Sequence, residues 1–141
     1  MLQRLIWLAL SAALATSVSN AQSNSNAPTT LQQTSAANGK QMFVSYCASC
    51  HGANGKGDGP VAASLKMPPP DLTMLSKNNH GEFPDRHILA VLENGTGVPS
   101  HGTAEMPVWG PLLARLDRAN PDVKHLRISN LTAYLKSIQA K

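Results

Sequence analysis

The chain has 141 residues, a formal net charge of +4 at pH 7 and 42% hydrophobic residues. This length allows one domain, and no bulk property of the composition is extreme. The small positive charge argues against a nucleic-acid-binding protein, which would need a dense basic face. It also argues against strong long-range steering of partners by charge.

The first 21 residues have the pattern of a secretory signal peptide. Arg4 gives a short positive start, Leu5 to Val18 is an almost uncharged apolar run, and residues 19–21 offer small side chains at the cleavage position. The apolar run is shorter than the roughly 20 residues that span a membrane. We therefore expect cleavage after Ala21, export to the periplasm and no stable membrane insertion afterwards.

Residues 22–37 are rich in Gln, Ser, Asn, Thr and Ala and poor in large apolar side chains. Such a segment cannot bury enough apolar surface to fold, so we predict a disordered polar spacer. The folded domain is then expected to comprise residues 38–141.

A helix is expected to start after Asn38, which can cap it, and to run toward Cys47. Gly39, Phe43 and Cys47 are spaced by four residues and so share one helix face. Gly39 would permit the close approach of another helix, and Phe43 would pack beside it.

The segment Cys47-Ala48-Ser49-Cys50-His51 follows at the end of this helix and contains both cysteines of the chain. Two thiols about one helical turn apart can each add to a vinyl group of the same porphyrin, while the next residue reaches the iron. The spacing therefore predicts one covalent haem c, with thioethers from Cys47 and Cys50 and with His51 as the proximal iron ligand.

Other uses of two close cysteines fit less well. An exported protein could pair them in a disulfide or use them as a redox-active pair. A thioredoxin-like pair would need strands that alternate with helices, and no such pattern is present. A zinc ribbon needs a second cysteine pair, and the spacing from His80 to His87 lies outside that of a Cys2His2 site.

The next segment is a loop, because four glycines among residues 52–60 exclude a helix or a strand interior. It lacks the Gly-Lys-Ser/Thr of a phosphate-binding loop, so a tight loop passing under a flat cofactor is the better interpretation. Residues 61–66 can form a short helical turn, which the prolines at 68–70 end. Asp71 or Thr73 can start one further turn.

The second half of the chain contains further helix patterns. Asp85 can cap a helix that Gly95 ends, residues 112–118 can form a short helix, and Asn120-Pro121 is a strong start for the last one. Their apolar faces comprise Ile88, Leu89 and Leu92 in the first helix and Val123, Leu126, Leu131, Tyr134, Leu135 and Ile138 in the last. No strand pair is indicated.

About 100 residues with so few apolar side chains need the haem to complete a core, so folding should depend on it.

The second axial ligand of the iron separates an electron carrier from an oxygen- or peroxide-using enzyme. Met106 is preferred over Met67, because it lies beyond a complete helix in a rigid Gly/Pro loop, whereas Met67 follows His51 too closely to cross easily to the opposite haem face. His101 is the main rival. The candidates considered are Met67, Met74, Met106, His80, His87, His101 and His125.

The folded part resembles the class I (mitochondrial-cytochrome-c-like) family of c-type cytochromes. The resemblance rests on the Gly39-x-x-x-Phe43-x-x-x-Cys47-x-x-Cys50-His51 pattern, on Gly59-Pro60, on Met106-Pro107 and on the C-terminal helix with Leu131 and Tyr134-Leu135. It implies a small all-α cytochrome c fold, with four to five helices and long Gly/Pro loops around one haem. It also implies that Tyr134 meets Phe43 and that the Pro60 carbonyl orients His51.

The loops around Met67 and Met106 look bacterial rather than mitochondrial. We therefore expect a monomeric, periplasmic one-electron carrier with His51 and Met106 as axial ligands, and not an enzyme. Its expected partners are redox proteins: a dehydrogenase or reductase as electron donor, and an oxidase or reductase as electron acceptor. The alternatives are an electron-transfer subunit of a dehydrogenase or terminal oxidase complex, and a haem enzyme or gas sensor with an open sixth position.

Overall fold

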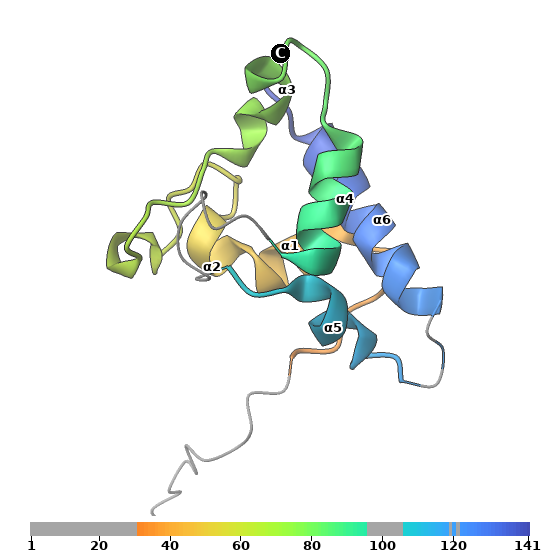
Figure 1. Ribbon diagram of the computed structural model, residues 1–141. Helices are drawn as coiled ribbons and strands as arrows, with labels where there is room; N and C mark the ends of the chain where they lie inside the picture. The colour runs from red at the N-terminus through yellow and green to blue at the C-terminus, as the bar shows by residue number, and fades with distance from the viewer. Residues whose placement is uncertain (1–30, 96–105, 119, 121) are drawn as a thin grey trace, which may run out of the picture.

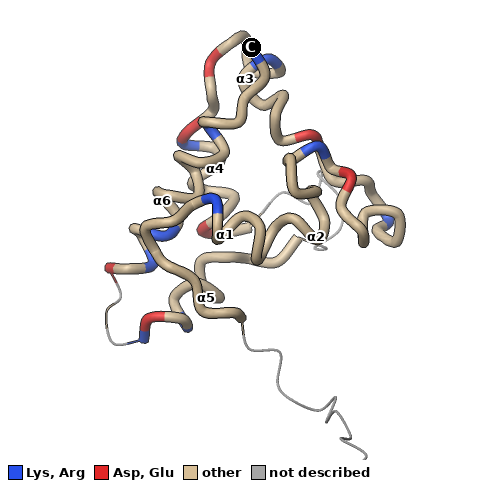
Figure 2. The backbone as a smooth tube through the Cα atoms, turned by 180° about the vertical axis from the view of Figure 1, so that it is seen from behind, with Lys and Arg blue, Asp and Glu red and all other residues tan. Residues whose placement is uncertain are grey.

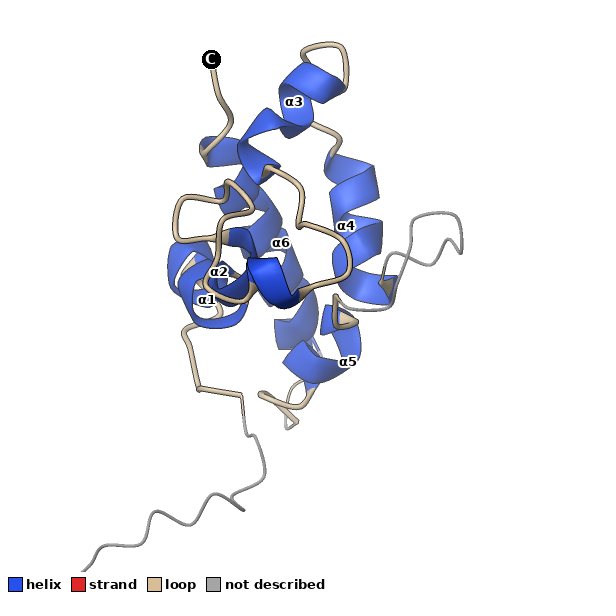
Figure 3. Ribbon diagram, turned by 90° about the vertical axis from the view of Figure 1, so that its left-hand side faces the viewer, coloured by secondary structure: helices blue, strands red, loops and turns tan. Residues whose placement is uncertain are grey.

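The computed structural model of the protein describes residues 31–95, 106–118, 120 and 122–141. These residues form α-helices and 3-10 turns and contain no β-strand, so the all-α prediction is confirmed (Figure 1, Figure 3). The predicted signal peptide and residues 22–30 of the predicted spacer lie outside the described residues. The helices are α1 (Gly39–Tyr46), α2 (Ala48–His51), α3 (Leu75–Asn78), α4 (Asp85–Asn94), α5 (Trp109–Ala114) and α6 (Asp122–Ser137), with 3-10 turns at Ala62–Ser64 and Leu72–Met74.

The C-terminal helix α6 organises the fold. It is 16 residues long and contacts α1, α4 and α5, so helices from both ends of the sequence meet on it (Figure 1). The apolar core lies where these four helices converge. Its buried members are Met42, Phe43, Tyr46, Cys47, Phe83, Ile88, Leu92, Trp109, Leu113, Ile128, Leu131 and Leu135.

Helix α1 crosses α6 at very short range, as the sequence predicts. The Asn38 side chain caps α1 by accepting a hydrogen bond from the backbone N–H of Gln41 at 2.8 Å. A Cβ atom added to Gly39 would collide with the backbone carbonyl of Asn130 and lie 2.9 Å from Tyr134 Cβ. Phe43 packs against Tyr134 with ring centroids 5.3 Å apart. Glycine at position 39 therefore permits the close crossing, and the Phe43–Tyr134 contact is confirmed.

Residues 31–37, which the composition predicts to be part of the disordered spacer, instead pack on this helix pair. Thr34 is 5% exposed, and its hydroxyl lies 2.7 Å from the Tyr46 hydroxyl and accepts a hydrogen bond from Arg127 at 3.1 Å. The Asn130 amide donates to the Ala36 carbonyl at 3.0 Å. These polar contacts hold a segment that has too few apolar side chains to fold alone.

Arg127 is a buried charge on α6 that the apolar pattern did not predict. The residue is 1% exposed, and its Nε donates to Asp117 Oδ2 at 2.6 Å. The predicted apolar face of this helix is also wrong at Leu126, which is 49% exposed, while Ile128 is buried. The buried residues of α6 are spaced by three or four positions and form one face, and Leu126 lies beside this face rather than on it; they are Arg127, Ile128, Leu131, Thr132 and Leu135.

The remaining helix boundaries differ from the predictions by a few residues. Helix α4 begins at Asp85 itself, whose side chain does not cap it and instead pairs with Lys136 at 2.9 Å. Gly95, with a φ of 81°, ends α4 as predicted.

Helix α5 begins at Trp109, earlier than the expected 112–118. Asn120 accepts a hydrogen bond from the Asp122 N–H at 3.1 Å, which is consistent with its predicted role at the start of α6.

Candidate functional site

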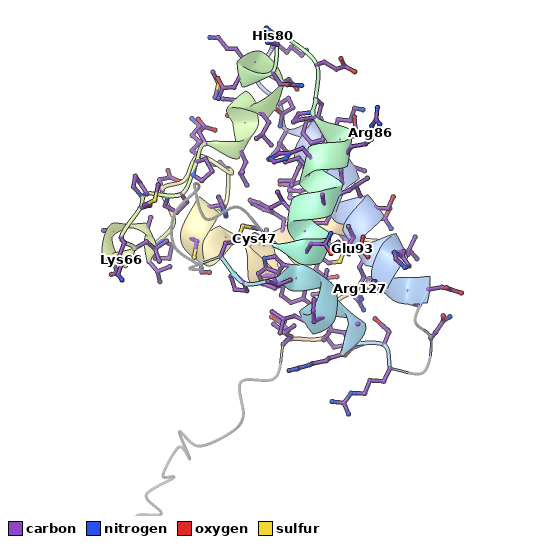
Figure 4. The ribbon with its side chains drawn as sticks, viewed as in Figure 1. Cys47, Lys66, His80, Arg86, Glu93 and Arg127 are labelled. Atoms are coloured by element: carbon purple, nitrogen blue, oxygen red, sulfur yellow. The ribbon has the colours of Figure 1, made fainter. Side chains whose placement is uncertain are left out.

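Cys47 lies at the junction of α1 and α2, where Figure 4 labels it, and Cys50 lies within α2. The backbone N–H groups of Cys50 and His51 both donate to the Cys47 carbonyl, at 3.2 and 2.9 Å. This hydrogen-bonded turn brings Cys47, Cys50 and His51 together within one turn of helix. Cys47 is buried and Cys50 is partly exposed.

The thiols do not have the properties of a disulfide or of a redox-active pair. Both cysteines are free. Burial, and then the neighbouring Cys50, raise the pKa of Cys47 to about 12, whereas reactive thiols have a lowered pKa. Within the part of the chain that the structure describes, no group of three or more His, Cys, Asp or Glu side chains could hold a metal ion. Two free thiols in one turn suit thioether attachment instead.

The His51 side chain is buried and orientated by a backbone carbonyl. Its Nδ1 lies 3.4 Å from the Pro70 carbonyl oxygen. Because a carbonyl can only accept, Nδ1 must carry the proton in this contact, which leaves Nε2 free to bind iron. Burial lowers the pKa of His51, and the hydrogen bond to Pro70 opposes this shift only in part. The imidazole is thus favoured in the neutral form that binds metal.

The residue that orients His51 is therefore Pro70, and the expectation that Pro60 does so is wrong. Pro60 is exposed and follows Gly59, which lies so close to α2 that an added Cβ would collide with the backbone of Cys50. After α2 the chain turns back past this helix and brings the three prolines at residues 68–70 to the imidazole. The three consecutive prolines before Asp71 are the only sequence signal that could have indicated this role, because prolines hold an extended backbone with free carbonyls.

The glycine-rich loop after α2 folds back on that helix through its backbone. The N–H groups of Gly57 and Gly59 donate to the carbonyls of His51 and Cys50, at 2.8 and 3.1 Å. Gly57 has a φ of 79°, and a Cβ there would collide with the Pro69 carbonyl. The loop thus brings the Pro69-Pro70 segment close to His51, and glycine at position 57 is what permits this approach.

The candidates for the second axial position differ in burial. Met106 is partly buried and packs against the apolar core. Met67 is 52% exposed, Met74 is partly buried in its 3-10 turn, and His101 lies outside the described residues. The three remaining candidates, His80, His87 and His125, are exposed.

An aromatic pair links the Met106 segment to the cysteine turn. Trp109, three residues after Met106, is 6% exposed and stacks on Tyr46, with ring centroids 5.7 Å apart and an interplanar angle of 26°. Tyr46 directly precedes Cys47. The Trp109–Tyr46 contact therefore brings the chain that carries Met106 toward the end of α1, and no sequence pattern predicted it.

The family model described as cytochrome c matches residues 36–139. The chain belongs to the cytochrome c family. A search of curated proteins and a search of solved structures found no match. As a cytochrome c, the protein carries covalently bound haem c with iron, and Cys47, Cys50 and His51 fit its Cys-x-x-Cys-His motif.

The residues present suit this cofactor chemically. Two unpaired thiols are available for thioether bonds, and a buried neutral imidazole next to them has its second nitrogen free for the iron. The matched segment begins at residue 36, which agrees with the packing of Ala36 on α6. Among the described residues, no helix has the length and apolar character needed to cross a membrane.

Proposed function

We propose that this cytochrome c is a periplasmic one-electron carrier, with His51 and Met106 as the axial ligands of its haem iron. The observation that carries the proposal is the buried His51 imidazole, whose Nδ1 faces the Pro70 carbonyl 3.4 Å away. Bound haem c supplies an iron that takes up and releases one electron between Fe(III) and Fe(II). The chain's residues would fix the imidazole, supply the second ligand and limit access of water.

Met106 is supported as the second ligand by its surroundings. It is partly buried against the core, and Trp109 attaches the same segment to Tyr46 next to Cys47. Met67, the other methionine followed by proline, is more than half exposed. A ligand held on both sides of the iron leaves no position for a substrate, which favours a carrier over an enzyme or gas sensor.

Replacing each methionine tests this assignment. Met106→Ala should abolish the Met-to-iron charge-transfer band of the oxidised protein, and the exposed Met67→Ala should leave it unchanged. If Met67→Ala removed the band and Met106→Ala did not, the ligand assignment would be wrong. If the unaltered protein lacked the band and bound carbon monoxide readily when reduced, an enzyme or sensor with an open sixth position would be the better conclusion.

The docking surface for redox partners is proposed to be small and largely apolar. Val61, Met67 and Val108 are 41%, 52% and 42% exposed, and they lie in the segments that carry Pro60 and Met106. Acidic and basic residues are interspersed along the backbone (Figure 2). Weak, short-lived contacts of this kind are typical of redox encounters.

The salt dependence of electron transfer tests the proposed surface. With the purified partner we expect a shallow dependence, since few charges would be desolvated or screened. Val108→Ser should slow transfer, while Leu126→Ser, a change at a similarly exposed position on α6, should not. A steep loss of rate between low and physiological salt would instead indicate a lysine patch. Stable co-purification with a membrane complex would indicate a fixed subunit rather than a diffusing carrier.

Export to the periplasm is proposed from the first 21 residues. Fractionation of cells, followed by N-terminal sequencing of the haem-containing protein, should find it in the periplasm with Gln22 as its first residue. A membrane-bound protein that still begins at Met1 would show that the segment is retained as an anchor.

A further inference from the structure

The last residues of the chain return to the loop that orients His51. Gln139, just beyond α6, makes three hydrogen bonds with its side-chain amide. Its Oε1 accepts from the Ser76 N–H at 2.9 Å, and its Nε2 donates to the carbonyls of Leu72 and Leu135 at 2.8 and 2.7 Å. One side chain thus connects the C-terminal end of α6 to the segment 72–76.

All three partners of Gln139 are backbone groups: the Ser76 N–H and the carbonyls of Leu72 and Leu135. The Ser76 N–H belongs to the first turn of α3, where backbone N–H groups lack a partner in their own helix. The Leu135 carbonyl belongs to the last turn of α6, where its backbone contact with the Ile138 N–H is long, at 3.4 Å. Only an amide can accept from the Ser76 N–H and also donate to the two carbonyls, those of Leu72 and Leu135. A carboxylate or an apolar side chain therefore cannot replace Gln139 here. In Figure 1 the C-terminus accordingly lies beside α3, and the Ala140 N–H adds a bond to the Thr73 carbonyl at 2.8 Å.

The segment held by Gln139 is rigidly connected to the Pro70 carbonyl. Leu72 lies two residues after Pro70, and its N–H donates to the Gly55 carbonyl at 2.7 Å while its own carbonyl accepts from Gln139. Asp71 lies between Pro70 and Leu72, and its Oδ1 accepts hydrogen bonds from the backbone N–H and the hydroxyl of Thr73, at 2.8 and 2.6 Å. These bonds leave Pro70 little freedom to move relative to Leu72.

We propose that Gln139 is a positioning residue for His51, because it holds the loop that keeps the Pro70 carbonyl against the imidazole. This inference deepens the proposed function, since it takes His51 as the proximal iron ligand. A carbonyl that accepts from Nδ1–H makes the imidazole a stronger donor to the metal and favours the oxidised iron. Loosening the loop should therefore weaken this hydrogen bond and raise the midpoint potential.

The test compares two substitutions of Gln139 with a matched control in the intact holoprotein. Gln139→Ala removes all three hydrogen bonds, and Gln139→Met removes them while keeping the length of the side chain. Asn130→Ala is the control, because Asn130 is also a neutral amide that ties α6 to a backbone carbonyl, that of Ala36. If Gln139→Ala folds poorly, Gln139→Met still provides the comparison, because its side chain fills the space of the glutamine.

The expected result is a rise in midpoint potential for both Gln139 variants. We expect the equilibrium constant for reduction to increase about threefold, which corresponds to about 30 mV for a one-electron couple. Hydrogen exchange at His51 Nδ1 and at the Ser76 N–H, followed by NMR, should become faster in the same variants. Asn130→Ala should change neither the potential nor these exchange rates.

Two outcomes would overturn the inference. If the Ser76 N–H exchanged faster but the potential and the exchange at His51 Nδ1 did not change, Gln139 would only stabilise the loop. If neither variant differed from the unaltered protein, Gln139 would not hold the loop at all. A failure of the proposed function is distinguishable, because NMR of the unaltered protein would then show that the His51 imidazole is not bound to iron.

Discussion

Two regions of the molecule join distant parts of the sequence but are held by different forces. One is the contact between α1 and α6, and the other is the loop that brings Pro70 to His51. The helix contact depends on side chains and close packing, with Gly39 against Asn130 and Phe43 against Tyr134. The loop, residues 52–76, has few buried side chains and is held by backbone hydrogen bonds to α2 and to the Gln139 side chain.

The difference shows what each region is suited to do. Apolar packing gives stability but little directional control, because dispersion and hydrophobic burial do not depend strongly on orientation. Hydrogen bonds add less net stability, but they fix the direction of donors and acceptors. The helix pair therefore supports the fold, whereas the loop can aim one carbonyl at one imidazole nitrogen. Mutations in the two regions should differ accordingly.

The largest effect is expected when haem attachment is removed altogether. Cys47→Ala combined with Cys50→Ala should leave a chain that is mostly unfolded after export, because neither the helix pair nor the loop can close over an empty centre. Circular dichroism should show little helix and no cooperative thermal transition. Ser49→Ala, an exposed change between the two cysteines, is the control. A compact apoprotein that melts cooperatively would contradict this prediction.

The next largest effect is expected at the buried charge beside the helix pair. Asp117→Asn would leave the Arg127 guanidinium buried without a charged partner, and should lower the free energy of unfolding by about 3 kcal/mol. This is the lower end of the range for such pairs, since Asp117 is 24% exposed. Arg127→Met should cost less, because it removes the buried charge and keeps much of the volume. Denaturant unfolding of both variants checks the order.

Overpacking the helix contact should have a somewhat smaller effect. Gly39→Ala places a Cβ against the Asn130 carbonyl and should lower the free energy of unfolding by about 2 kcal/mol, since α1 and α6 must move apart. The exposed neighbour Lys40→Ala serves as the control in the same denaturant titration. An unchanged stability for Gly39→Ala would mean that this crossing is loosely packed.

On the loop side, Asp71→Ala should cause a smaller loss, and that loss should depend on pH. Hydrogen bonds from the Thr73 side chain and backbone lower the pKa of Asp71. The stability that the carboxylate contributes is thus present above the pKa of the unfolded chain and is lost as the pH falls through the lower pKa of the folded state. The gap in melting temperature between the unaltered protein and Asp71→Ala should therefore shrink on acidification. Asp71→Asn keeps an acceptor without a titrating group, so its stability relative to Asp71→Ala should not depend on this ionisation.

The smallest effect is expected at the surface ion pair between α4 and α6. Lys136 and Asp85 are 2.9 Å apart, but their side chains are 56% and 46% exposed. Lys136→Ala should lower the free energy of unfolding by less than about 1 kcal/mol, and this difference should decrease further in high salt. A loss as large as that of Gly39→Ala would show that the pair supports the contact between α4 and α6 more strongly than its exposure indicates.

Much of the local structure and the attachment chemistry could be predicted from short-range patterns. The cap at Asn38, the end of α4 at Gly95, the Asp71 turn and the thiol spacing in Cys47 to Cys50 depend on residues within about one helical turn. Gly39 and Phe43 were also predicted correctly as helix-contact residues, because a spacing of four places them on one face of α1.

Only the tertiary structure decided which distant groups meet at the site. The resemblance indicated Pro60 as the partner of His51, and the path of the glycine-rich loop brings Pro70 there instead. In the same way, Thr34 is buried only because Arg127 and Tyr46 reach it from two different helices. Such contacts depend on the whole path of the backbone, and a periodic pattern specifies which face of a helix is buried but not what lies opposite it.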